Sequence, residues 1–153
     1  MKLKIDFYKT KLGGVMINNC KNEIVVYTSM VADLFHIGHL NLIKRAKKLG
    51  TTLIVGVIVD ECVYEYKGRM PIFSTNERRS IISSIKYVDK VVLQYERDGT
   101  NSASNFKQID IIVRGDDTIL KKEKAFIENK GGKYITLSRT PEISTTQLIN
   151  KIR

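Results

Sequence analysis

The chain has 153 residues, a length that suits one well-packed domain and is short for two. Its 42% hydrophobic and 27% charged residues are close to globular averages, which excludes disordered, collagen-like and fibrous chains. The charge is unusual, because 26 Lys and Arg against 16 Asp and Glu give a net charge of +10. Such a balance favours nucleic acid, an acidic membrane surface or small phosphorylated molecules as partners, or else it reflects a solvated basic surface.

The sequence carries no sign of export or membrane insertion. No stretch approaches the ~18 consecutive apolar residues of a membrane span, and residues 1–14 lack an apolar signal core. Cys20 and Cys62 are too few for a disulfide framework, which suits a reducing compartment. We therefore expect a cytoplasmic protein with a basic N-terminal extension over residues 1–22 and one domain over residues 23–153.

Five short β-branched runs with little polar alternation recur along the chain, at residues 23–29, 52–58, 90–94, 110–113 and 134–137. This pattern is typical of strands covered on both faces, as in a parallel sheet. Helical patterns fall between the runs, over residues 38–49, from Ser74, over residues 120–129, and from Ser144 onward. Ser74 and Glu77 also have capping-box spacing. The alternation predicts a Rossmann-like, doubly wound α/β sandwich with a five-stranded parallel sheet, which binds ligands at the carboxyl ends of its strands.

The only two histidines, His36 and His39, follow the first run and flank Gly38 at the start of a helix. Two imidazoles beside backbone N–H groups and a positive helix end suit a phosphate, and Gly38 would let an anion approach the backbone closely. A zinc site is disfavoured because neither cysteine is near in sequence and no HExxH glutamate is present. Two structural histidines are the other interpretation.

The segment DLFHIGH, from Asp33 to His39, resembles the HxGH signature of the nucleotidyltransferase superfamily. The chain resembles its cytidylyltransferase branch, typified by the glycerol-3-phosphate and choline-phosphate cytidylyltransferases. Further matches run in family order: KGR at 67–69 with NERR at 76–79, YVDKVV at 87–92, GDD at 115–117 and RTPEISTT at 139–146. The chain departs from the family at residues 30–33, where MVAD replaces G-[TI]-F-D, at Glu142, which replaces a glycine, and at Thr118, where the glycerol-phosphate branch often has tryptophan.

The resemblance implies CMP transfer from CTP to the phosphate of a small phosphorylated alcohol, with release of pyrophosphate, in the synthesis of a phospholipid or cell-envelope precursor. It implies that His36 and His39 contact the triphosphate and the transition state. We expect Lys67 to bridge the acceptor phosphate and the α-phosphate, with Arg69 as helper, and Arg139 to grip phosphate oxygens with its planar fork.

A wider set of residues is predicted to bind the nucleotide: Ser29, Met30, Val31, Asp33, Gly38, Arg69, Arg78, Gly115, Asp116, Asp117, Ile143, Ser144 and Thr145. Ser144 or Thr145 is at least as readily a plain N-cap, and Arg78 a structural ion pair. Asp116 and Asp117 are acceptors, which suits the base, the ribose or a magnesium ion. Mg²⁺ is expected with the triphosphate, and no metal ligand is assigned in the protein.

Other functions fit parts of the pattern. An adenylyltransferase of the heptose-phosphate or FMN type shares HxGH, and the altered residues 30–33 leave room for a phosphonate acceptor. The charge of +10 fits a nucleic-acid-binding module, but no aromatic-studded strand or basic recognition helix supports one, so no nucleic-acid partner is expected. A catalytically inactive nucleotide sensor is disfavoured by the intact histidines. The resemblance also implies a homodimer with its contact near residues 78–89.

Overall fold

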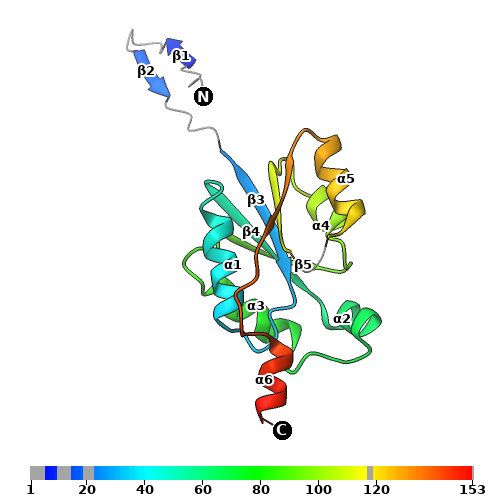
Figure 1. Ribbon diagram of the computed structural model, residues 1–153. Helices are drawn as coiled ribbons and strands as arrows, with labels where there is room; N and C mark the ends of the chain where they lie inside the picture. The colour runs from blue at the N-terminus through cyan, green and yellow to red at the C-terminus, as the bar shows by residue number, and fades with distance from the viewer. Residues whose placement is uncertain (1–5, 10–14, 19–22, 117–118, 153) are drawn as a thin grey trace.

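The computed structural model describes residues 6–9, 15–18, 23–116 and 119–152. Five strands form an all-parallel sheet in the order β5-β4-β3-β6-β7 (Figure 1). Their bounds are β3 (Val25–Met30), β4 (Thr52–Ile58), β5 (Lys90–Gln94), β6 (Ile111–Gly115) and β7 (Lys133–Leu137). Each predicted run coincides with a strand whose ends differ from the prediction by at most two residues. The predicted Rossmann-like fold with a five-stranded parallel sheet is therefore confirmed.

The helices lie between the strands of this sheet and after it. Their bounds are α1 (Ile37–Lys47), α2 (Asp60–Lys67), α3 (Thr75–Ser83), α4 (Thr100–Ser104), α5 (Lys121–Asn129) and α6 (Thr145–Ile152). The predicted capping box begins α3, because the Ser74 hydroxyl accepts from the Glu77 N–H and the Glu77 carboxylate accepts from the Ser74 N–H. The sequence prediction missed α2 and α4, which are short and have no side-chain cap at their N-termini.

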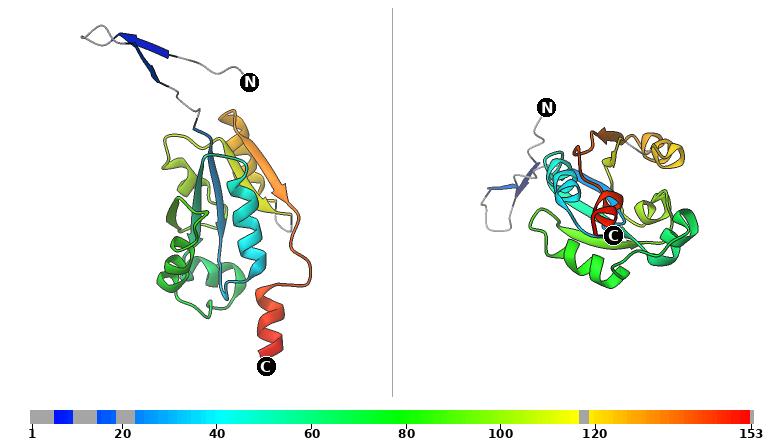
Figure 2. Two further views of the ribbon diagram at one scale, coloured as in Figure 1. Left: turned by 90° about the vertical axis from the view of Figure 1, so that its left-hand side faces the viewer. Right: turned by 60° about the horizontal axis from the view of Figure 1, so that its bottom comes forward.

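Helices cover both faces of the sheet, as the apolar runs predict (Figure 2). Side chains alternate along each strand, so Val26 and Val55 pack into the cluster beneath α1 and α3, while Tyr27, Ile54 and Ile112 face the opposite cluster with α4 and α5. Each central strand thus buries both of its faces, which explains why polar alternation is absent from its sequence.

Two short strands precede the sheet. β1 (Asp6–Lys9) and β2 (Val15–Asn18) pair antiparallel, with Asp6 opposite Asn18. The side chains of residues 1–22, on which the predicted basic extension depends, lie outside the described residues. In the part of the chain that the structure describes, no helix has the length and apolar character needed to cross a bilayer.

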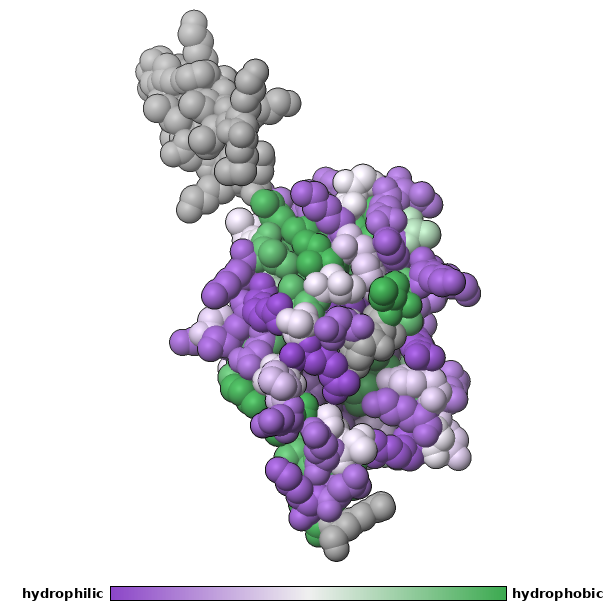
Figure 3. All heavy atoms as spheres, viewed as in Figure 1, coloured by the Kyte–Doolittle hydropathy of each residue, from purple (hydrophilic) through white to green (hydrophobic). Residues whose placement is uncertain are grey.

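Hydrophilic residues cover most of the face shown in Figure 3. Several surface cations have defined partners and so are not simply solvated. Lys47 forms an ion pair with Asp89 at 2.5 Å, and Asp89 also accepts from the Leu53 N–H. The Arg45 guanidinium donates to the Ser138 carbonyl at 2.7 Å. Through these contacts α1 is joined to the sheet and to the segment after β7.

Candidate active site

One pocket of about 370 Å³ opens at the carboxyl ends of the parallel strands, where ligands bind in folds of this kind. It brings together fourteen of the predicted site residues: Ser29, Met30, Val31, Asp33, His36, Gly38, His39, Lys67, Arg69, Gly115, Arg139, Ile143, Ser144 and Thr145. Arg78 and Asp116 are not part of its lining, and Asp117 lies outside the described residues. Segments far apart in the sequence therefore meet in one place.

The two histidines cap α1 reciprocally. The His36 Nδ1 accepts from the Gly38 N–H at 3.0 Å, and the His39 Nδ1 accepts from the His36 N–H at 3.4 Å. The two ring centroids are 4.0 Å apart. Because each Nδ1 is an acceptor, each neutral ring carries its proton on Nε2, which remains to serve a ligand as a donor. The spacing of the two histidines thus places two Nε2–H donors at the N-terminus of α1.

The electrostatics of the pocket keep these rings neutral. Burial, together with the nearby His36 and Lys67 and against an opposing effect of Asp33, lowers the pKa of His39 to about 4. Burial also lowers the pKa of His36, and the positive charge of Arg139 acts in the same direction. Both histidines are therefore uncharged hydrogen-bond donors near neutral pH.

Gly38 is required by the position of the His36 ring. A Cβ at residue 38 would lie 2.8 Å from the His36 Cε1 and 2.9 Å from its Nδ1. These separations are shorter than any normal contact, so a side chain at residue 38 would displace the ring. The glycine of the HxGH pattern thus makes room for the capping histidine.

Asp33 joins three parts of the pocket wall. Its carboxylate accepts from the N–H groups of Leu34, Ile72 and Phe73, and its carbonyl accepts from the Thr145 hydroxyl at 2.9 Å. These bonds connect the loop after β3 with the loop after α2 and with the start of α6. Asp33 lines the pocket, but its carboxylate is engaged by the backbone, which makes it a positioning residue.

The start of α6 completes the wall opposite α2. The Ser144 hydroxyl accepts from the Gln147 N–H at 3.2 Å and is therefore an N-cap, as the alternative interpretation held. The Asn41 side chain donates to the Thr140 hydroxyl, which fixes the preceding loop on α1. Arg139 lines the pocket, and its backbone N–H donates to the Asp116 carboxylate at 3.2 Å.

The model of the family described as "Cytidylyltransferase-like" matches residues 31–151. The chain belongs to the cytidylyltransferase-like family. An ethanolamine-phosphate cytidylyltransferase of Dictyostelium discoideum is 31% identical over 137 residues, covering 86% of this chain and 38% of that protein. An FAD synthase of Thermococcus sibiricus is 41% identical over 102 residues, covering 63% of this chain and 66% of that protein. The chain thus spans little more than a third of the length of the first relative.

Solved structures agree with this assignment. The crystal structure of a lipopolysaccharide core biosynthesis protein from Thermoplasma volcanium superposes with a TM-score of 0.65 at 31% identity, over 78% of this chain and 98% of that one. The resemblance inferred from the HxGH segment and its companions is therefore confirmed at the level of the family and of the fold.

Arg78 has a different role from the predicted one. It is fully buried, and its guanidinium donates to the carbonyl oxygens of Val31, Ile58 and Phe73 and to the Asp60 carboxylate at 2.5 Å. A side chain without solvent exposure and with these partners cannot grip a nucleotide in the pocket. The alternative interpretation as a structural ion pair is the one that fits, and Arg78 ties the loops beneath the pocket together.

The fit of a magnesium ion depends on the carboxylates of the pocket. No group of three or more His, Cys, Asp or Glu among the described residues is arranged to hold a metal ion. Asp33, the one acid lining the pocket there, already accepts three backbone N–H groups. The described residues therefore do not form a magnesium cage.

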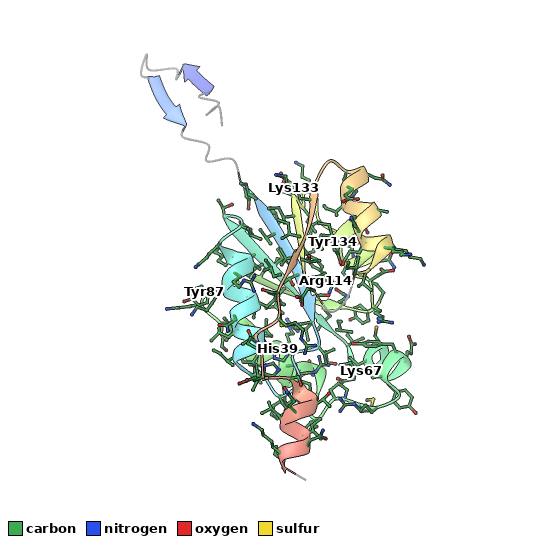
Figure 4. All side chains as sticks on the ribbon, viewed as in Figure 1. His39, Lys67, Tyr87, Arg114, Lys133 and Tyr134 are labelled. Atoms are coloured by element: carbon green, nitrogen blue, oxygen red, sulfur yellow. The ribbon has the colours of Figure 1, made fainter. Side chains whose placement is uncertain are left out.

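Sequence reasoning missed a buried network around Arg114, which itself lines the pocket. Arg114, which ends an apolar run, donates to both Glu123 carboxylate oxygens at 2.7 and 2.5 Å and to the Ser29 carbonyl and hydroxyl. The Tyr27 hydroxyl donates to the Gln94 side chain at 2.6 Å. A polar residue that directly follows a buried run was the available signal for Arg114. Figure 4 shows Arg114 at the sheet, with His39 by α1 and Lys67 at the end of α2.

Proposed function

We propose that the chain transfers CMP from CTP to the phosphate of a small phosphorylated alcohol, with release of pyrophosphate. The observation that carries the proposal is the pair of neutral imidazoles, each with Nε2–H as its donor, at the start of α1 in a pocket that Lys67 and Arg139 also line. Helix N-termini, N–H donors and fixed cations together suit a triphosphate. The chain's membership of the cytidylyltransferase-like family supports this reaction class.

The chemistry needs no protein nucleophile. An oxygen of the acceptor phosphate attacks the α-phosphorus of CTP, the bond from that phosphorus to the bridging oxygen breaks, and the electron pair leaves with pyrophosphate. Negative charge gathers on the equatorial and leaving oxygens, so catalysis depends on positioning and on donors aimed at them. In this proposal His36 and His39 serve the triphosphate, Lys67 joins the two phosphates, and Mg²⁺ accompanies the nucleotide.

A second candidate is adenylyl transfer on the same site. The observation in its favour is the similarity to FAD synthase and to the bifunctional protein HldE of Campylobacter fetus, which is 33% identical over 140 residues. The resemblance of the RTPEIST and GDD segments to cytidylyltransferase motifs supports CTP in this proposal. The family relationship is compatible with either nucleotide.

The decisive assay measures pyrophosphate release with each of the four nucleoside triphosphates against a panel of phosphorylated alcohols and one phosphonate. We expect turnover with CTP and a phosphorylated alcohol, and we expect His39→Ala to lower kcat by on the order of 10² or more, because one charge-stabilising donor is lost. Lys122→Ala is the matched control, since Lys122 is exposed on α5 outside the pocket. Turnover with ATP alone would overturn the choice of CTP, and near-normal turnover of the His39 variant would overturn the assigned role.

A further inference from the structure

The pocket has two halves that lie on either side of the central strand β3. One half contains Gly115, Arg139 and Thr145 from the β6, β7 and α6 side, which the sequence predicts to bind the nucleotide and its phosphates. The other half lies under β4, β5 and α2 and contains Ile58, Val63, Tyr66, Lys67 and Arg97. In the proposed reaction Lys67 binds the acceptor phosphate. The half that contains Lys67 is therefore the space for the rest of the acceptor.

The backbone of Arg97 is held in place by the Gln94 side chain. The buried Gln94 side chain donates to the carbonyl oxygens of Glu96 at 2.6 Å and Arg97 at 3.3 Å, and it accepts in turn from the Tyr27 hydroxyl. The Gln94 carbonyl also accepts from the Val59 N–H. The backbone that carries Arg97 is thus connected to β5, β4 and β3 by hydrogen bonds through Gln94, which hold the base of its side chain in place.

The Arg97 guanidinium lies over the Tyr66 ring, 5.0 Å from its centroid. The ion pairs of the described residues do not include Arg97. The Lys67 ammonium lies 5.7 Å from the same centroid. Two cations therefore lie within 6 Å of the centre of one aromatic ring.

The lining offers little to an ammonium group. Six arginines and lysines line the described pocket, against one acid, Asp33, whose carboxylate is occupied by three backbone N–H groups. Tyr66 is the aromatic side chain that could hold a cation there, and two cations already lie within 6 Å of its centre. A phosphorylated amine would bring a third positive charge to this ring, and the described lining residues offer no free carboxylate to receive it.

We propose, resting on the proposed function, that the acceptor carries a second anionic oxygen group besides its reacting phosphate, and that Arg97 binds this group. An arginine fork matches a carboxylate or a phosphate with two parallel hydrogen bonds. The substrate class is then a phosphorylated hydroxy acid or a bisphosphate, in contrast to the phosphorylated amine named for the ethanolamine-phosphate relatives. Arg97 and Lys67 would hold the two ends of one molecule.

The test compares acceptors of matched size with the purified full chain and CTP: ethyl phosphate, phosphoethanolamine, 2-phosphoglycolate, 3-phosphoglycerate and ethylene glycol bisphosphate. We expect kcat/KM for an anionic acceptor to exceed that for phosphoethanolamine by tenfold or more, as the loss of a charged hydrogen bond typically costs. The ratio of kcat/KM for 2-phosphoglycolate to kcat/KM for ethylene glycol bisphosphate identifies whether a carboxylate or a second phosphate is bound. Preference for phosphoethanolamine or ethyl phosphate overturns this inference alone, whereas no transfer with any acceptor and any triphosphate refutes the proposed function with it.

Charge reversal assigns the selectivity to Arg97. Arg97→Glu should lower kcat/KM for the preferred anionic acceptor by tenfold or more relative to phosphoethanolamine. The loss should come from a raised KM for the acceptor. Arg97→Lys, which keeps the charge, should retain part of the selectivity. Lys122→Glu makes the same change in net charge on the exposed face of α5 and should leave the ratio unaltered. If Arg97→Glu instead raises KM for CTP and leaves the acceptor ratio unaltered, Arg97 serves the triphosphate and the inference is wrong.

Discussion

Replacing Gly38 with alanine should lower activity strongly while leaving the stability of the fold almost unchanged. The new Cβ would meet the His36 ring at 2.8 Å, so the ring must rotate away and lose the hydrogen bond from the Gly38 N–H. Loss of an N-cap typically costs about 1 kcal/mol. Alanine in place of glycine within α1 returns about 1 kcal/mol through helix propensity. The two effects offset, so we expect the free energy of unfolding to change by no more than about 1 kcal/mol.

Turnover should respond very differently to the same change. The displaced ring withdraws its Nε2–H from the triphosphate, and loss of one such donor lowers kcat by on the order of 10²–10³. Urea unfolding measures the stability, and steady-state pyrophosphate release with CTP measures the turnover. Full activity in Gly38→Ala would show that the position of the His36 ring does not matter and would refute the reasoning.

A double-mutant cycle identifies the cause of the loss. If the alanine acts only by moving His36, the variant Gly38→Ala with His36→Ala should be no slower than His36→Ala alone, because the displaced ring is already absent. If the methyl group instead blocks an anion from the backbone, the double variant should be slower by a further large factor. The cycle therefore distinguishes two reasons for a glycine at residue 38: space for the His36 ring, or close approach of a phosphate to the backbone.

Three further predictions concern stability. The pKa of His39 is lowered to about 4 by burial and by the nearby His36 and Lys67, so the unfolded chain takes up the proton first as the pH falls. Stability should be full above about pH 6.5 and decline by at most ~3 kcal/mol towards pH 4, and urea unfolding across this range should show a flatter profile for His39→Asn. Arg78→Lys should cost about 3 kcal/mol or more in urea unfolding, because a single ammonium cannot serve all the acceptors that the guanidinium reaches. Unchanged stability with a raised KM for CTP would instead show that Arg78 contacts the nucleotide. Glu142 has φ 60°, so Glu142→Gly should raise the free energy of unfolding by up to about 1 kcal/mol, and a fall would argue against strain at this residue.

Features encoded locally were predictable from the sequence. The β-branched runs predict the strands because both faces of the sheet are covered, and the Ser74–Glu77 spacing alone sets the start of α3. Glu142 stands where the family has glycine and does adopt a left-handed conformation, which requires no long-range information. The histidines were predictable for the same reason, since their reciprocal caps span three residues.

Features that depend on distant partners were not predictable. Arg78 follows a recognisable pattern, but its acceptors Val31 and Ile58 lie 47 and 20 residues away, and they decide that it is buried. Arg97 lies in a segment that no motif marks, and it meets Tyr66, the residue before the KGR motif, only because β4, which α2 follows, pairs with β5. Sequence patterns reveal which residues can bind phosphate but not which of them the fold turns inward.

The charge of the pocket and the neutrality of its histidines have one cause. Arg139 lowers the pKa of His36, and Lys67 lowers that of His39, in addition to the effect of burial. The cations that attract a triphosphate therefore also keep the imidazoles in the uncharged form, whose tautomer is fixed by the caps of α1. Anions that enter the pocket oppose this effect and raise the pKa of both rings. The positive balance of the chain thus contributes to the protonation state of the site as well as to binding.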